Sequence, residues 1–229
     1  MVASEITDVF FDLDHTLWDF DKNSQLAFQR VFQNHNIELE LDRFISEYEP
    51  INSLYWKKYR DEIIGKDELR RGRLIDTFNV FNISMPLQQI DMMAASYIEE
   101  LPKDNYLLEN TFEILDYLFP KYRLHIITNG FEVVQQLKLS NSGIQNYFHT
   151  VTTSEDAGIK KPHPFIFESA LKKAAVSALS SIMIGDNMEA DILGAKSAGM
   201  NTLFFNYRNE KVVPPILAVN RLIDIKNYL

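Results

Sequence analysis

The chain of 229 residues contains no cysteine. Without a thiol it can form no disulfide, no thiolate nucleophile and no thiolate metal site. It also lacks any apolar run close to the roughly 18 residues that a membrane-spanning helix needs. Its first residues, MVASEITDVFFDLD, lack the basic segment and the long apolar stretch of a secretory signal peptide. We therefore expect a cytoplasmic protein that does not insert into a membrane.

Positive charge is also scarce, because 23 lysine and arginine residues stand against 32 aspartate and glutamate residues, a net charge of −9. Proteins bind DNA or RNA by neutralising phosphates with clustered Lys and Arg, so no nucleic acid polymer is expected as a partner. A small anionic substrate is compatible with this charge if a few cations gather locally. Apolar residues make up 46% of the chain, enough for a large core in one domain with an insertion or in two small domains.

Short, nearly continuous apolar runs recur along the chain, as expected of strands that are buried on both faces. These runs cover residues 6–11, 124–128, 181–184 and 202–205. Helical patterns lie between them, as at residues 111–119 and 164–175. The alternation of strands and helices predicts an α/β fold with a parallel sheet.

Residues 19–100 have a different pattern, with no strand-like runs and with apolar residues at helical spacing. The clearest example is Ile90, Met93, Ala94 and Ile98. We therefore expect an all-helical domain at residues 19–100, inserted into an α/β domain made of residues 1–18 and 101–229.

Two aspartates, Asp12 and Asp14, follow the first apolar run in the segment DLDHT. Two neighbouring carboxylates can divide the work of catalysis, since an ionised one attacks or binds metal and a protonated one donates a proton. The alternative is that Asp14, His15 and Thr16 only form a turn and cap the next helix.

Two further polar segments follow apolar runs. In ITNG, the Thr128 hydroxyl and the Asn129 backbone amide suit a phosphate oxygen, although Asn-Gly is also a common turn. In KKP, Lys160 and Lys161 precede a proline that can begin a helix, where a lysine can neutralise an anion. A solvated pair of lysines is the alternative for KKP.

The segment GDNMEAD places Asp186, Glu189 and Asp191 after another apolar run. Carboxylate oxygens at a strand end suit Mg²⁺, which prefers a few carboxylates together with water and substrate phosphate. Capping of the next helix is the alternative, and it suits Asp191 in part. Because ligands of open parallel sheets bind beyond the carboxyl ends of the strands, we expect the four polar segments to meet at one edge.

In this order, FDLDHT, ITNG, KKP and GDNMEAD resemble the motifs of the haloacid dehalogenase (HAD) superfamily of phosphohydrolases, over most of the chain. The helical insertion resembles the cap domain of that superfamily. The longer strings ITNGF, GIKKPHPFIF and GDNMEADILGAKSAG resemble the branch of pyrimidine 5′-nucleotidases. The resemblance implies a Rossmann-like parallel sheet with helices on both faces, and a Mg²⁺-dependent phosphomonoesterase that acts on a small phosphorylated substrate, here a nucleoside monophosphate.

The resemblance also assigns roles to these residues. It implies that Asp12 is the nucleophile, that Asp14 is the general acid and base, and that Mg²⁺ is held by Asp12, the Asp14 backbone carbonyl and Asp186. It further implies that Thr128 and the Asn129 amide hold the phosphoryl oxygens. Lys161, rather than Lys160, would balance the charge of Asp12 and of the phosphate. Asp191 would orient Lys161 or the water bound to the metal.

The helical insertion should choose the substrate, with Arg73 as the candidate contact for an anionic group. Arg70 and Arg71 are expected on a solvated helix face. Four aromatic residues could stack on a base, although their helical spacing equally suits a core. They are Tyr48, Tyr55, Trp56 and Tyr59. For His15 we expect packing in its loop rather than contact with substrate.

Other functions remain open at this point. A sugar-phosphate phosphatase or a phosphomutase shares all four motifs. A haloacid dehalogenase has no need of Asp14 and Asp186, and a phospho-accepting signalling module has no need of a large helical insertion.

Overall fold

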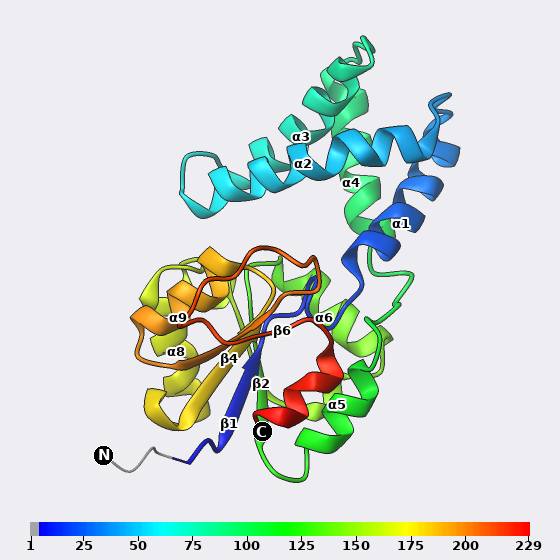
Figure 1. Cartoon of the computed structure of the whole chain (residues 1–229). Coiled ribbons are helices and arrows are strands. Elements are labelled where there is room, and N and C mark those ends of the chain that lie inside the picture. The colour runs from blue at the N-terminus through cyan, green and yellow to red at the C-terminus, as the bar shows by residue number, and fades with distance from the viewer. Residues whose placement is uncertain (1–4) are drawn as a thin grey trace. The chain divides into compact units, whose positions relative to one another are not determined.

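A computed structural model describes residues 5–229 (Figure 1). The described chain forms two compact units. The sheet unit comprises residues 5–20 and 105–229, and the helical unit comprises residues 21–104. No helix among the described residues is both long enough and apolar enough to cross a membrane.

The sheet unit contains a parallel sheet of six strands in the order β3-β2-β1-β4-β5-β6. The strands are β1 (Asp8–Phe11), β2 (Arg123–Thr128), β3 (Phe148–Thr153), β4 (Ser181–Gly185), β5 (Asn201–Phe205) and β6 (Ala218–Val219). Helices flank both faces of the sheet (Figure 1). They are α5 (Thr111–Leu118), α6 (Glu132–Asn141), α7 (Ser154–Ala157), α8 (Pro164–Ala174), α9 (Gly194–Ser197) and a π-helical segment, Met188–Leu193. The predicted α/β fold is confirmed.

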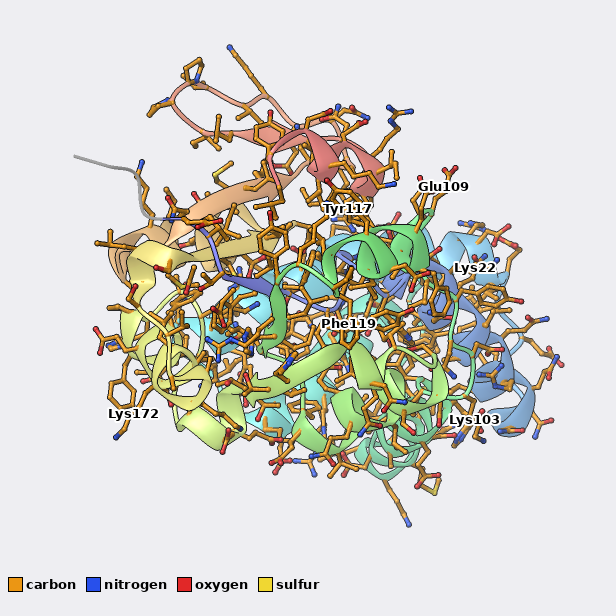
Figure 2. All side chains as sticks on the ribbon, turned by 90° about the horizontal axis from the view of Figure 1, so that it is seen from below. Lys22, Lys103, Glu109, Tyr117, Phe119 and Lys172 are labelled. Carbon is orange, nitrogen blue, oxygen red and sulfur yellow. The ribbon has the colours of Figure 1, made fainter. Side chains whose placement is uncertain are left out.

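The sheet core follows from the apolar runs. All four residues of β1 are buried, as expected of a central strand covered on both faces. On one face, Phe10, Ile127 and Met183 pack in one cluster with Ile166 and Phe167 of α8. Charged side chains such as Glu109 and Lys172 project outward (Figure 2). Strands β3 and β6 are absent from the sequence prediction because β3 has only two apolar residues, Phe148 and Val151, and β6 is only two residues long.

The helical unit consists of α1 (Phe20–His35), α2 (Leu41–Arg60), α3 (Lys66–Val80) and α4 (Leu87–Glu100). Its core is aromatic: the Phe28 ring lies 4.6 Å from the ring of Tyr48 and 4.3 Å from that of Tyr97. The unit extends beyond α4 because Arg30 of α1 forms ion pairs with both Glu100, at 2.7 Å, and Asp104.

At the amino ends of the central strands, a buried carboxylate joins β1 to β2. Asp8 accepts a hydrogen bond from His125 Nε2 at 2.9 Å and forms an ion pair with Arg123 at 2.8 Å. Since Asp8 can only accept, the proton of the neutral imidazole is on Nε2, and Nδ1 accepts from the Thr150 hydroxyl at 2.8 Å. Burial lowers the pKa of His125, although the Asp8 carboxylate opposes this shift.

This arrangement predicts a pH-dependent stability. Because the pKa of His125 in the folded protein lies below the ordinary 6.5, its contribution is fully present above pH 6.5 and is lost as the pH falls below that value. Relative to His125→Gln, the wild-type free energy of unfolding should fall by up to about 1.4 kcal/mol per pH unit in that window. Denaturant unfolding between pH 7.5 and 5 measures the difference, and a constant difference would contradict the prediction.

Candidate active site

The carboxyl ends of the three central strands bring the predicted residues together. Asp12 follows β1, Thr128 ends β2, and Asp186 follows β4. The Asp12 backbone N–H donates to the Ile184 carbonyl at 2.9 Å, which extends the pairing of β1 and β4 to the site itself. Polar side chains that are far apart in the sequence therefore meet at one edge of the sheet.

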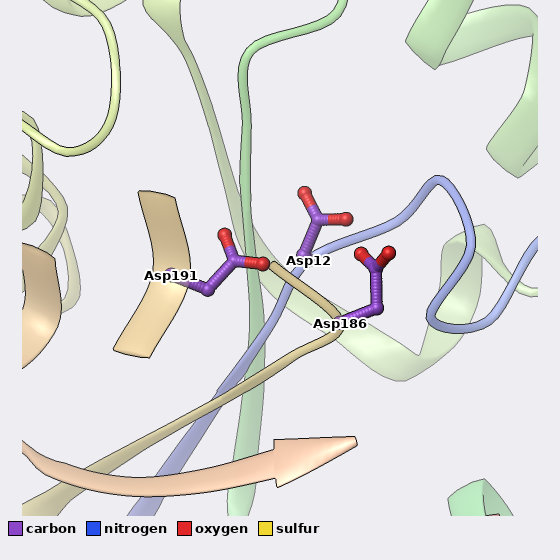
Figure 3. A group of neighbouring side chains, drawn as sticks. All are labelled: Asp12, Asp186 and Asp191. Atoms are coloured by element: carbon purple, nitrogen blue, oxygen red, sulfur yellow. The ribbon is translucent and has the colours of Figure 1, made fainter. Parts of the chain in front are cut away.

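Three carboxylates form the centre of this edge (Figure 3). Asp12, Asp186 and Asp191 each offer one oxygen, and these oxygens lie within 4.8 Å of one another. Burial raises the pKa of Asp12 to about 7; the Lys161 charge opposes this shift and the Asp191 charge reinforces it. Burial also raises the pKa of Asp186 well above its ordinary value, reinforced by Asp12 and Asp191. Concentrated carboxylate oxygens of this kind suit a hard divalent cation.

Lys161 is the buried cation beside Asp12. Its Nζ lies 2.6 Å from Asp12 Oδ1, 2.7 Å from Asp191 Oδ1 and 2.7 Å from the Ile127 carbonyl oxygen. Burial alone would lower the pKa of this ammonium, but the two carboxylates outweigh burial and raise it. Lys160, by contrast, is partly exposed. The structure thus places Lys161, and not Lys160, against Asp12.

The Asn129 side chain fixes the loop that carries Lys161. Its Nδ2 donates to the Lys161 carbonyl at 2.9 Å, and its Oδ1 accepts from the Lys161 N–H at 2.8 Å. The sequence interpretation considered only the backbone amide of Asn129. The Asn129 side chain therefore joins the end of β2 to the KKP segment, in addition to the role expected of its backbone amide.

Asp191 is positioned by its own loop. Its Oδ2 accepts from the Asn187 N–H at 3.0 Å. A Cβ atom at Gly185 would lie 2.3 Å from the same oxygen, so only glycine leaves room for this carboxylate. The cap of the π-helical segment is Asn187, which accepts from the Ala190 N–H at 2.8 Å. Asp191 thus contacts Lys161 through Oδ1 and holds the backbone of the cap residue through Oδ2, so capping describes it in part.

Thr16 is a residue whose role the sequence interpretation missed. Its buried hydroxyl accepts from the Asp186 N–H at 3.1 Å and thereby joins the first motif to the fourth. The sequence feature that could have indicated this role is the threonine of D-x-D-x-T, which the turn interpretation assigned to local capping.

Asp14 has two partners on α6 that the sequence interpretation also missed. Lys138 Nζ lies 2.5 Å from Asp14 Oδ1, and Gln135 Nε2 donates to Asp14 Oδ2 at 3.1 Å. Gln135 Nε2 also lies 2.7 Å from Thr128 Oγ1, which accepts a further bond from the Gly130 N–H at 3.1 Å. A hydroxyl has two acceptor lone pairs and one donor, so these bonds leave the Thr128 proton to be donated.

His15 packs in its loop. The residue has a left-handed backbone with φ of 63°, and its ring lies 4.7 Å from the ring of Phe20. Its Nδ1 lies 3.0 Å from the Tyr207 hydroxyl and 3.3 Å from Arg208.

In the helical unit, Arg73 is buried, with its guanidinium 5.1 Å from the ring of Tyr97. Its Nη1 donates to Asn52 Oδ1 at 2.8 Å, while its Nε has no hydrogen-bond partner among the described residues. Tyr48 belongs to the aromatic core, with 1% of its surface exposed.

The other helical-unit candidates are spread over α2 and α3. The Tyr55 hydroxyl donates to Asp76 at 2.8 Å, and Tyr59 packs against the partly exposed Trp56. Arg71 forms an ion pair with Asp91, and Arg70 is partly exposed. Tyr55 and Arg71 line one pocket together with Asp76, and Trp56, Tyr59 and Arg70 are not among the residues that line it.

A family model described as haloacid dehalogenase-like hydrolase matches residues 9–205. The chain belongs to this family of hydrolases. It is 28% identical over 225 residues to the pyrimidine 5′-nucleotidase YjjG of Escherichia coli, with 96% of each chain covered. It is 34% identical to a glyceraldehyde 3-phosphate phosphatase of Pyrococcus abyssi, covering 87% of this chain and 81% of that one.

Among solved structures, the chain is similar to the HAD-hydrolase YfnB of Bacillus subtilis, described as bound to magnesium. The TM-score is 0.89 at 26% identity, and 99% of each chain is covered. The resemblance to the HAD superfamily and to its pyrimidine 5′-nucleotidases, predicted from the four motifs, is confirmed.

Proposed function

We propose that the protein is a Mg²⁺-dependent phosphomonoesterase that forms an aspartyl-phosphate on Asp12. The observation that carries the proposal is the meeting of three groups at the carboxyl ends of the central strands: the buried Asp12, the Lys161 ammonium at 2.6 Å and the neighbouring carboxylate Asp186. A covalent intermediate divides one difficult displacement into two easier ones.

The donor set fits magnesium. Three carboxylate oxygens within 4.8 Å of one another repel, and burial, reinforced by the charge of Asp191, raises the pKa of Asp12. We propose that Asp12, Asp186 and the backbone carbonyl of Asp14 hold the ion. When bound, Mg²⁺ would supply positive charge against the carboxylates and the phosphoryl oxygens. The magnesium described for YfnB supports this assignment.

The remaining residues suggest a reaction in two halves. The Thr128 hydroxyl, the Asn129 backbone amide and Lys161 would bind the phosphoryl oxygens. An oxygen of Asp12 attacks phosphorus, the bond to the ester oxygen breaks, and that oxygen takes a proton from Asp14. In the second half, Asp14 takes a proton from water as the water oxygen bonds to phosphorus and Asp12 recovers its electron pair.

We propose a pyrimidine nucleoside 5′-monophosphate as the substrate, supported by the similarity to YjjG along nearly the whole chain. The helical unit would act as the cap that selects the substrate. Arg73 is its proposed anion contact, because its buried Nε has no partner among the described residues. A small sugar phosphate is the second candidate, favoured by the similarity to the phosphatase of Pyrococcus abyssi.

Phosphate release from a panel of esters tests this proposal. The panel comprises UMP, dUMP, dTMP, glyceraldehyde 3-phosphate and a hexose 1-phosphate, each with Mg²⁺ and with EDTA. We expect the highest kcat/KM for a pyrimidine nucleotide, and a loss of at least about 100-fold in EDTA, because the crowded carboxylates and the phosphoryl group then lack their counter-charge. A preference for glyceraldehyde 3-phosphate would refute the nucleotide assignment. Conversion of the hexose phosphate into an isomer without phosphate release would identify a mutase.

A further inference from the structure

Helix α6 buries two polar side chains, Gln135 and Lys138, together with the apolar Val134 and Leu139. Val133 and Leu137 are 69% and 43% exposed, whereas Gln135 and Lys138 are buried at 0% and 1%. Positions three residues apart lie on the same face of a helix, so Gln135 and Lys138 project together. That face contacts the loop that carries Asp14. Because Gln135 and Lys138 are buried while Val133 and Leu137 are exposed, the two polar side chains need polar partners at the buried face.

Lys138 is held in place by that loop. Its Nζ lies 4.1 Å from the Trp18 ring and 5.2 Å from the Phe20 ring, and it pairs with Asp14 Oδ1 at 2.5 Å. Burial of an ammonium is costly unless the charge is paired. Because aromatic rings line its surroundings, the Asp14 carboxylate is the group that makes this burial tolerable, and Lys138 in return fixes one oxygen of Asp14.

Gln135 fixes the other oxygen and connects it to the second motif. Its Nε2 lies 3.1 Å from Asp14 Oδ2 and 2.7 Å from Thr128 Oγ1. The glycine of ITNG makes room for this side chain, since a Cβ at Gly130 would lie 2.4 Å from Gln135 Cδ. Gly130 does not have a positive φ, so space and not backbone freedom is what requires glycine here.

From these contacts we infer that Lys138 and Gln135 are positioning residues, which hold both carboxylate oxygens of Asp14 in the orientation needed to activate water. The inference rests on the proposed function. In the step concerned, Asp14 takes one proton from water, the water oxygen bonds to phosphorus, and the bond between phosphorus and Asp12 breaks with its electron pair returning to the Asp12 carboxylate. An Asp14 side chain that rotates freely would slow this step.

Lys138→Met tests the inference with p-nitrophenyl phosphate, whose leaving group departs without a proton. The first half reaction should then proceed, and kcat/KM should stay within about threefold of wild type, while kcat falls by about 100-fold because water activation is impaired. Rapid mixing should show a burst of about one p-nitrophenolate per active site before the slow turnover. A purely structural role predicts no burst and a fall in kcat/KM, and that result would overturn the inference.

A double-mutant cycle with Asp14→Asn shows whether Lys138 acts through Asp14. Adding Lys138→Met to Asp14→Asn should change kcat by less than about twofold, since the residue that Lys138 orients is already disabled. Additive losses would contradict the inference. Gln135→Met should show the same burst with a smaller loss of kcat, and it replaces Lys138→Met as the test if that variant does not fold.

The matched control is Lys173→Met, which removes an exposed lysine paired with Asp156 at 2.7 Å. It should leave both kinetic constants within about twofold of wild type. Wild-type protein that released no phosphate from any ester in Mg²⁺ would refute the proposed function. An active wild type whose Lys138→Met variant shows no burst would refute only the positioning role.

Discussion

We expect Asp12→Asn to lower kcat by about 10⁴-fold or more while the protein stays folded. The carboxamide has nearly the shape of the carboxylate but cannot form the acyl-phosphate bond to phosphorus. Both half reactions pass through that bond, so no later step can compensate. Phosphate release under single-turnover and steady-state conditions measures the loss.

The variant should fold because Lys161 keeps two other partners, Asp191 Oδ1 and the Ile127 carbonyl oxygen, both at 2.7 Å. The charge of Asp12 is itself unfavourable in its place, since burial raises its pKa from 3.8 to about 7. A raised carboxyl pKa means that stability is fully present below pH 3.8 and is lost as the pH rises towards 7. In EDTA, the stability of Asp12→Asn relative to wild type should therefore increase from pH 4 to pH 7.

The matched control for this substitution is Asp156→Asn, which alters an exposed carboxylate paired with Lys173. Its kcat should remain within about twofold of wild type. Turnover of Asp12→Asn near the wild-type rate would refute the proposed nucleophile. Loss of its cooperative unfolding transition would instead show that Asp12 is needed for folding.

Features with a strong one-dimensional signal could be predicted from the sequence. Central strands that are buried on both faces appear in the sequence as apolar runs. The ends of β1, β2 and β4, and the polar residues that follow these ends, could therefore be located. Because parallel strands share one carboxyl edge, their convergence followed from topology alone. The edge strand β3 was missed, since it is only partly buried and carries no such run.

The residues that hold Asp14 could not be predicted, for a specific physical reason. The sequence rule for helices places apolar side chains inside and polar side chains outside. In α6 this rule assigns Gln135 and Lys138 to solvent and Val133 to the core, the opposite of the structure. The burial of these polar side chains depends on their partners Asp14 and Thr128. Asp14 lies more than a hundred residues before Gln135 in the chain, and Thr128 only a few residues before it. Only the fold brings both to the same face of one helix.

In the helical unit, the sequence predicted the type of structure but could not separate core residues from candidate binding residues. Helical spacing is the same for an aromatic side chain in a core and for one that stacks on a ligand. Tyr48 is a core residue because Phe28 and Tyr97 pack against it at 4.6 Å and 6.2 Å. The proposed role of Arg73 rests on its buried Nε, a feature that spacing cannot reveal.

The second large effect is expected at Lys161. Lys161→Met keeps the length of the side chain but leaves Asp12 and Asp191 buried without their common cation. Removing one partner of a buried ion pair costs about 3–5 kcal/mol, because the remaining charge is uncompensated. Loss of a cation aimed at the phosphoryl group should lower kcat by about 10³-fold. Denaturant unfolding and steady-state phosphate release measure the two losses.

Lys160→Met is the matched control, because it removes the neighbouring lysine of the same KKP segment, which is partly exposed. Its kcat and its free energy of unfolding should stay close to wild type, within about threefold and about 0.5 kcal/mol. Equal losses in the two variants would contradict the assignment of Lys161 as the cation beside Asp12.

The loss of stability in Lys161→Met should be smaller in Mg²⁺ than in EDTA, since a divalent cation bound by Asp12 and Asp186 would supply part of the missing positive charge. A loss of stability that is the same in both solutions would argue against metal binding at these carboxylates, and so separates the role of the lysine from that of the ion.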